Sequence, residues 1–264
     1  MDCDSINEND YMASGLPERF EGIKGVLFDY GGTLDSGGDH WSEVIWRAWQ
    51  EAGVTELADV GKDLFREAYV YAERELARVR HIMPEDDFYQ LLRKKMRIEF
   101  EWLASCSGFP SGRIGEMAEA TACICDDEAR RRVAEARPVL EFLAARYPLA
   151  LVSNFYGNVE SVLQAYGLRD YFGEIIESAV VGVRKPDPEI WRLGVRALGM
   201  NAEEVLVVGD SYTKDILPAL AAGCRAVWIK GKGWTDKEDA QTYPDTISCI
   251  ADLISKCPNL TDSN

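Results

Sequence analysis

The stretch at residues 23–34 reads Ile23-Lys24-Gly25-Val26-Leu27-Phe28-Asp29-Tyr30-Gly31-Gly32-Thr33-Leu34. Its short apolar run ends at Asp29 and is followed by two glycines, a pattern that predicts a buried strand of a parallel sheet. In open α/β sheets, ligands bind beyond the carboxyl ends of the strands. Asp29 therefore lies where a carboxylate can attack an electrophile and hold a cation at the same time. Taken alone, the same residues also fit an ordinary Asp-Tyr-Gly-Gly turn.

Outward from this stretch, strands and helices alternate along the second half of the chain. Apolar runs at 149–152, 174–178, 205–208 and 226–229 predict strands, and helical patterns at 159–166, 188–198 and 215–222 lie between them. Such alternation is typical of a doubly wound parallel α/β sheet, a Rossmann-like core.

Between the first strand and this alternating part, residues 41–135 carry helical periodicity and hardly any strand pattern. One helical stripe consists of Leu64, Ala68, Tyr71, Leu76 and Val79, and the last helix of the block is expected at 113–136. We therefore expect an α/β core from residues 21–36 and 137–264, an all-helical insert at 37–136, and a disordered N-terminal arm at 1–20.

The overall charge excludes some partners. The 264 residues include 29 Lys and Arg against 45 Asp and Glu, a formal net charge of −16, which argues against nucleic acid or anionic membrane as the main partner. The acidic start does not resemble a signal peptide, and no apolar run is long enough to span a bilayer. Seven scattered cysteines predict reduced thiols in a cytoplasmic protein.

Polar side chains are expected at four places along one edge of the sheet, and Asp29, after the first strand, is the first of them. Ser153 and Asn154 follow the second strand, Lys185 lies in the loop before the helix at 188–198, and Asp210 and Asp215 follow a later strand. Three carboxylates that face one another repel unless a cation lies among them, and an all-oxygen ligand set favours Mg²⁺. Lys185 would balance charge and hold a phosphoryl oxygen, to which Ser153 could donate. Each residue alone also fits a turn, a helix cap or a solvated loop.

These motifs, in this order, resemble the haloacid dehalogenase-like hydrolase superfamily: Asp29 to Leu34, Ser153-Asn154, Lys185-Pro186, and Gly209-Asp210-Ser211 through Asp215. The resemblance covers about residues 23–255 and is weak over the insert, which in such proteins is a helical cap. It implies a Mg²⁺-dependent phosphatase of small phosphorylated metabolites. Asp29 would be the nucleophile, and Lys185 a second catalytic residue. The Mg²⁺ ligands would be Asp29, Asp210, Asp215 and the carbonyl of Gly31. The phosphoryl group would be bound by Ser153, Asn154, Lys185 and Thr33.

The chain departs from the family pattern at Gly31, where the phosphatases carry a second Asp that acts as general acid and base. Because general acid–base catalysis contributes ~10²–10⁴-fold, we expect reduced activity, most of all on alkyl phosphates. Asp35 and Asp39 are near enough in sequence to be considered as substitutes.

Other readings of the same motifs are a non-catalytic relative that binds metal and phosphate, or cleavage of carbon–halogen or carbon–phosphorus bonds. The intact acidic residues argue against the metal-free dehalogenase branch. The carbon–phosphorus branch needs a cap lysine, but Lys62, Lys94 and Lys95 lie in no plainly apolar stretch that would depress a lysine pKa. Candidate substrate contacts in the insert, for which we expect core packing or solvation, are Trp41, Trp46, Arg74, Arg78, Arg80 and His81.

Overall fold

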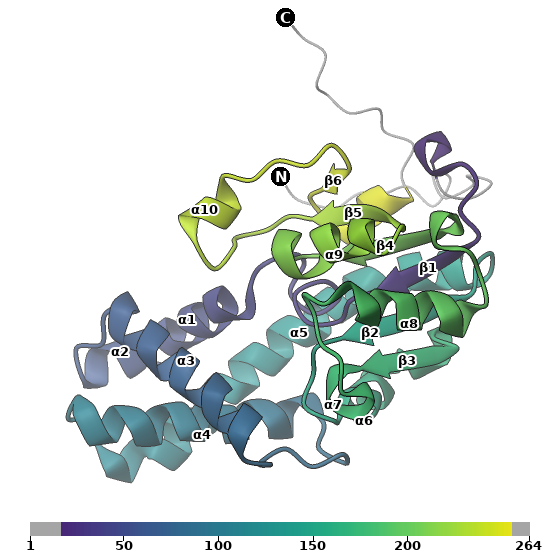
Figure 1. Ribbon diagram of the computed structural model, residues 1–264. Helices are drawn as coiled ribbons and strands as arrows, with labels where there is room; N and C mark the ends of the chain where they lie inside the picture. Colours follow the sequence, from purple (N-terminus) through teal and green to yellow (C-terminus); the bar gives the residue numbers. More distant parts are fainter. Residues whose placement is uncertain (1–16, 255–264) are drawn as a thin grey trace, which may run out of the picture.

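The protein is described by a computed structural model that covers residues 17–254. The expected N-terminal arm therefore lies almost entirely outside the described residues. A parallel sheet forms the centre of the molecule (Figure 1). Its six strands have the order β3–β2–β1–β4–β5–β6 and all pairs are parallel. The strands are β1 (Gly25–Phe28), β2 (Leu149–Ser153), β3 (Glu174–Glu177), β4 (Val205–Gly209), β5 (Arg225–Ile229) and β6 (Thr246–Ile247). The predicted doubly wound α/β fold is confirmed.

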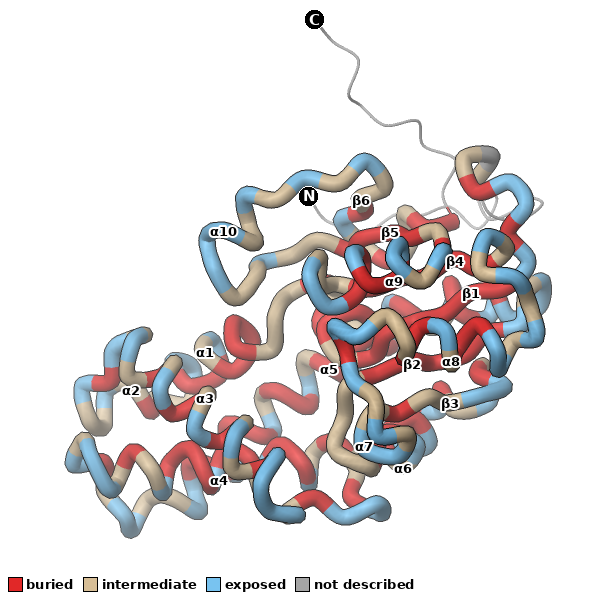
Figure 2. The backbone as a smooth tube through the Cα atoms, in the orientation of Figure 1, coloured by how far each residue is buried: buried red, intermediate tan, exposed pale blue. Residues whose placement is uncertain are grey.

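Alternate side chains of the central strands pack on opposite faces of the sheet, as the period of two requires. Val26 and Phe28 belong to the apolar core that contains α5 (Ile114–Ala144) and α6 (Val159–Ala165), whereas Leu27 packs with Ile190 and Trp191 of α8 (Pro188–Leu198) on the other face. Both faces are covered, so β1, β2 and β4 are buried along their whole length, as Figure 2 shows. This burial explains why these strands read as continuous apolar runs in the sequence.

The helices of the α/β part are short. They are α6 (Val159–Ala165), α7 (Ser178–Val181), α8 (Pro188–Leu198), α9 (Leu217–Ala221) and α10 (Asp236–Asp239). Short 3-10 turns lie at Glu18–Phe20, Ser111–Arg113, Arg169–Tyr171, Ala202–Glu204 and Ile250–Leu253. The expected helix at 215–222 is present as α9, and a π-helical turn, Tyr212–Ile216, precedes it and takes up its first two residues.

A group of helices lies beside the sheet (Figure 1). In the sequence, these helices come between β1 and β2. These helices are α1 (Trp41–Glu51), α2 (Val54–Leu57), α3 (Lys62–Arg78), α4 (Phe88–Cys106) and α5 (Ile114–Ala144). Among residues 17–254, no helix is both long and apolar enough to cross a membrane.

Helix α5 is longer than the sequence predicts, because it does not end at Ala136. It continues through Pro138 to Ala144, a length of 31 residues. Proline removes one backbone hydrogen bond of a helix, and such a residue is retained where packing holds the helix on both sides. Here Val133 and Ala136 before the proline and Val139, Leu140 and Leu143 after it are all buried in one core. The same core contains residues of α3 and α4 and one face of the sheet.

Candidate active site

Three aspartates converge at the carboxyl edge of the sheet. Asp29 follows β1, and its backbone N–H donates to the carbonyl of Val208 in β4 at 2.9 Å. Asp210 follows β4, and Asp215 lies in the π-helical turn. One carboxylate oxygen from each of the three lies within 4.8 Å of the others. The parallel topology thus brings together the three carboxylates that the sequence analysis places at one edge.

Lys185 lies between two of these carboxylates. Its Nζ is 2.7 Å from Oδ1 of Asp29 and 2.7 Å from Oδ1 of Asp215, and its side chain is almost fully buried. Burial works to lower the pKa of Lys185, but Asp215 and Asp29 together raise it above its usual value. The lysine is therefore a fixed positive charge inside the acidic cluster.

The cluster has more negative charge than one lysine balances. Burial, together with the neighbouring carboxylates Asp215 and Asp29, raises the pKa of Asp210 well above its usual range. The pKa of Asp215 is also raised, first by burial, against the opposing effect of Lys185. A group of crowded carboxylate oxygens with raised pKa values fits a hard divalent cation, because such an ion would favour their ionised forms.

Two glycines allow the acidic loops to approach closely. A Cβ on Gly32, whose φ is +98°, would lie 2.3 Å from Cγ of Asp210, and a Cβ on Gly209 would lie 2.4 Å from Cβ of Asp215. Any larger residue would displace the carboxylates, so these positions require glycine.

The polar residues expected to bind phosphate fall into two groups. Ser153 is buried at the end of β2 and, like Asn154 and Lys185, lines the cavity in front of the aspartates. The amide of Asn154 is occupied by Lys185: its Nδ2 donates to the Lys185 carbonyl at 3.1 Å, and its Oδ1 accepts from the Lys185 N–H at 2.9 Å. Asn154 thus positions the lysine loop.

Thr33 is placed differently from the expectation. Its Oγ1 donates to Oδ1 of Asp210 at 3.1 Å, and Thr33 is not among the residues that line the cavity. The hydroxyl therefore orients a carboxylate of the acidic cluster, and its expected contact with a phosphoryl group stays a prediction.

Gly31 lines the cavity without any side chain to move a proton. Of the two expected substitutes, Asp35 is fully buried behind the site, and its Oδ1 accepts hydrogen bonds from the Gly32 N–H at 2.7 Å and from Trp41 Nε1 at 3.0 Å. Burial raises the pKa of Asp35 to about 8. Its place outside the cavity lining gives it no direct path to a substrate.

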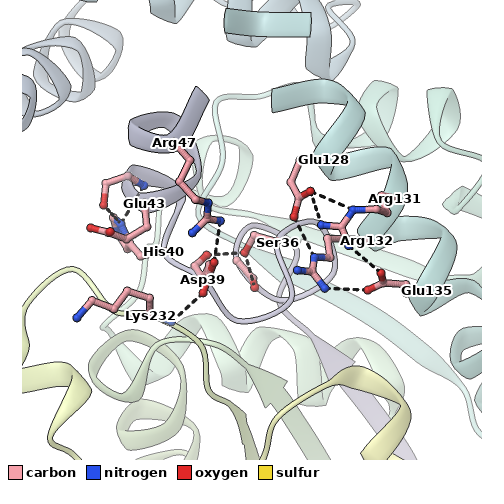
Figure 3. A network of polar contacts seen from close by, with 12 residues as sticks. Ser36, Asp39, His40, Glu43, Arg47, Glu128, Arg131, Arg132, Glu135 and Lys232 are labelled. Carbon is pink, nitrogen blue, oxygen red and sulfur yellow. Dashed lines mark hydrogen bonds and ion pairs between the residues drawn. The ribbon is translucent and has the colours of Figure 1, made fainter. Parts of the chain in front are cut away.

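Asp39 is held in a network of polar contacts at the junction of the helices and the sheet (Figure 3). Its Oδ2 accepts from Arg47 at 2.8 Å, and its Oδ1 accepts from the backbone N–H of Lys232 at 2.8 Å. Asp39 does not line the cavity either. Neither of the two carboxylates therefore lines the cavity that Gly31 faces.

The opposite wall of the cavity comes from the helical group and its neighbouring loops. The cavity measures about 180 Å³. Lining residues that the sequence analysis did not name are His40, Tyr69, Glu73 and Tyr156, together with Lys214 of the π-helical turn; Lys95, which it named, also lines the cavity. Of the candidate substrate contacts, only Trp41 lines the cavity; Trp46, Arg74, Arg78, Arg80 and His81 do not. Tyr69, Glu73 and Leu76 recur at helical spacing, which predicts that they lie on one face of α3. The sequence does not show that this is the face turned towards the cavity.

Comparisons with known proteins agree with this geometry. A model of a haloacid dehalogenase-like hydrolase family matches residues 23–223. Phosphoserine phosphatase of Thermus thermophilus is 36% identical over 154 residues, which make up 56% of this chain and 59% of that protein. Phosphoglycolate phosphatase of Yersinia pseudotuberculosis is 27% identical over 251 residues, 92% of this chain and 98% of that protein.

The chain spans less than two thirds of the length of the Thermus thermophilus protein. Among solved structures, magnesium-bound YfnB of Bacillus subtilis has a TM-score of 0.54 at 18% identity, over 88% of this chain and 96% of that chain. At this identity the likeness concerns the fold.

Proposed function

The chain belongs to the haloacid dehalogenase-like hydrolase family, and on that basis we propose that it is a Mg²⁺-dependent phosphatase of a small phosphorylated metabolite. The observation that carries the proposal is the cluster of Asp29, Asp210 and Asp215 around Lys185 at the carboxyl edge of the sheet. The phosphatase names of the two relatives support the same class of reaction.

Each residue of the cluster has a distinct part in this proposal. Asp29, Asp210, Asp215 and the carbonyl of Gly31 would hold Mg²⁺, which when bound offsets the negative charge of a phosphoryl group. A carboxylate oxygen of Asp29 attacks phosphorus, so that an O–P bond forms to Asp29 while the bond to the leaving oxygen breaks. Lys185 and Ser153 bind the phosphoryl oxygens. Water then cleaves the aspartyl-phosphate and regenerates the carboxylate.

The absence of an acid at Gly31 shapes the expected activity. The leaving oxygen receives no proton from a side chain at this position, so aryl and acyl phosphates react faster than alkyl phosphates. The attacking water also lacks a base there, so the aspartyl-phosphate is long-lived. The placement of Asp35 and Asp39 outside the cavity supports a second candidate function, a metal- and phosphate-binding protein with little turnover.

Carbon–phosphorus cleavage is disfavoured by the state of the one insert lysine that lines the cavity. Lys95 is buried, contrary to the expectation from its sequence surroundings, but it forms an ion pair with Glu73. Burial works to lower the pKa of Lys95, whereas Glu73 and nearby tyrosines raise it well above its usual value. A lysine that stays protonated cannot attack a carbonyl carbon.

We also propose that residues 37–136 act as a cap over the α/β core formed by 21–36 and 137–264. Trp41 of α1, Tyr69 of α3 and Lys95 of α4 support this division, because they line the cavity opposite Asp29. The cap would exclude water from the reacting groups and contact the leaving group.

Hydrolysis of an aryl phosphate with and without Mg²⁺ tests the proposal, with Asp29→Asn as the matched control. We expect Mg²⁺-dependent release of phosphate that is lost in the Asn variant and after chelation. Equal, near-zero rates in the wild type and the variant would instead favour the binding protein.

A further inference from the structure

Glu73 of α3 presents a carboxylate to the cavity from the cap side. Its side chain is 36% exposed and lines the same cavity as Asp29. Two neighbours fix its position. Lys95 of α4 donates to Oε1, and the hydroxyl of Tyr156, from the loop after β2, lies 3.0 Å from Oε1 and 3.2 Å from Oε2. Glu73 is thus held from both the cap and the core.

Both partners of the Lys95–Glu73 pair are ionised. Burial alone would raise the pKa of Glu73, but Lys95 and the hydroxyl of Tyr156 hold it below its usual value. Lys95 lies behind the carboxylate with 4% of its side chain exposed and with its Nζ 3.9 Å from the centre of the Tyr69 ring. Both groups line the cavity, but the carboxylate of Glu73 is the more exposed of the two, because only 4% of the Lys95 side chain is exposed.

The carboxylate keeps capacity for a ligand. An ionised carboxylate offers about four lone-pair sites, and its contacts with Lys95 and Tyr156 do not fill them. The exposed Lys214 lines the same cavity, and its charge acts on the carboxyls of both Glu73 and Asp210. Glu73 therefore lies within electrostatic reach of the site where a phosphoryl group would bind.

We propose that Glu73 binds a protonated amine on the group that the phosphate ester releases, so that the substrate is a phosphate monoester of an amino alcohol or hydroxy amino acid. This inference rests on the proposed phosphatase function. A leaving group without an amine would leave the exposed side of the Glu73 carboxylate without a positively charged partner from the substrate. A hydroxy amino acid carries a carboxylate beside its amine, and the exposed Lys214, which lines the same cavity, offers a positive charge to it.

A purely structural ion pair between α3 and α4 would predict no such selectivity, and kinetics separate the two cases. We would measure kcat/KM for O-phosphoethanolamine, O-phosphoserine, propyl phosphate and phosphoglycolate in the wild type, Glu73→Gln and Glu75→Gln. Glu75 is the matched control, since it lies on the same helix, bonds to Arg78 and does not line the cavity. A double variant, Glu73→Gln with Lys95→Met, removes both charges and guards against misfolding from an unpaired buried lysine.

A hydrogen bond to a charged group contributes about 1.5–3 kcal/mol, or roughly 10- to 100-fold. We expect the ratio of kcat/KM for phosphoethanolamine over propyl phosphate to fall by that factor in Glu73→Gln and in the double variant, and to stay constant in Glu75→Gln. A wild-type ratio near one, or a ratio that survives both Glu73 variants, would overturn the inference.

Failure of the phosphatase proposal itself has a different signature, namely no hydrolysis of any ester, the aryl phosphate included. In that case, thermal stabilisation of the Asp29→Asn protein by phosphoethanolamine and by propyl phosphate, each with Mg²⁺, decides the matter. Stronger stabilisation by the amine supports the role of Glu73, and equal stabilisation refutes it.

Discussion

Restoring a carboxylate at Gly31 is the sharpest perturbation that the site offers. A Cβ built on Gly31 meets no atom closer than Cδ1 of Trp41, at 4.0 Å, which is ordinary van der Waals contact. The first side-chain atom of Gly31→Asp therefore finds open space at this position. Replacing a glycine where the backbone conformation suits other residues stabilises a protein by about 0.4–1 kcal/mol. This gain partly offsets the cost of adding a negative charge to the acidic cluster.

The surroundings of position 31 suit a general acid. The indole of Trp41 flanks position 31. Because the N–H of this indole already donates to Asp35, it has no hydrogen bond to give to the ionised form of a new carboxylate. An apolar neighbour raises the pKa of a carboxyl group towards the range in which it can donate a proton. Because general acid–base catalysis contributes ~10²–10⁴-fold, Gly31→Asp should raise kcat on an alkyl phosphate by up to that factor.

The assay compares Gly31→Asp with Gly31→Asn, which has the same shape but no ionisable proton. Phosphate release from an alkyl ester and an aryl ester is followed over a range of pH. We expect a gain on the alkyl ester, a much smaller gain on the aryl ester, and a new limb in the pH profile of the Asp variant alone. Equal kcat values for the Asp and Asn variants on the alkyl ester would refute the view that the missing acid limits turnover.

Two further substitutions test the electrostatics of the interior. Lys185→Met removes the positive charge that pairs with Asp29 and Asp215, so the metal-free variant should lose about 3–5 kcal/mol of unfolding free energy. Adding Mg²⁺ should restore part of that stability. A melting temperature equal to that of the wild type would contradict the prediction. Glu99 is fully buried on α4, and burial raises its pKa to about 8 from 4.5, so the folded state keeps a proton that the unfolded state loses. The contribution of Glu99 to the free energy of unfolding is then fully present below pH 4.5 and falls by up to about 5 kcal/mol as the pH rises to about 8. Urea denaturation of Glu99→Gln should not show this loss. Parallel pH profiles of stability for the wild type and the variant would contradict the prediction.

The core of the site could be predicted from the sequence because its signals are local. A buried apolar run, an aspartate and glycines mark the end of β1 and of β4, and parallel topology then places Asp29 and Asp210 at the same edge without further information. The same reasoning predicts that Lys185 lies near them. Its two equal contacts with Asp29 and Asp215 depend on the path of a loop, which periodicity does not encode.

The cap wall could not be predicted, because it depends on how α3 is rotated about its axis. The stripe with Tyr71 and Val79 is the wrong one: these side chains are 42% and 36% exposed, whereas Phe65, Tyr69 and Ala72 are buried. Both stripes share Ala68 and Leu76, so the sequence pattern does not separate them. The buried face turns Glu73 towards the cavity, where it meets Lys95 from another helix, and such a pair depends on tertiary packing.

The unbroken course of α5 has a consequence for dividing the molecule. A cut between Ala136 and Arg137, where the insert was expected to end, would pass through a helix and not through a linker. One fragment would keep 23 of the 31 residues of that helix and the other 8, each with an apolar face separated from part of its partners. We therefore expect neither part to keep its packing when it is produced alone or transplanted onto another scaffold.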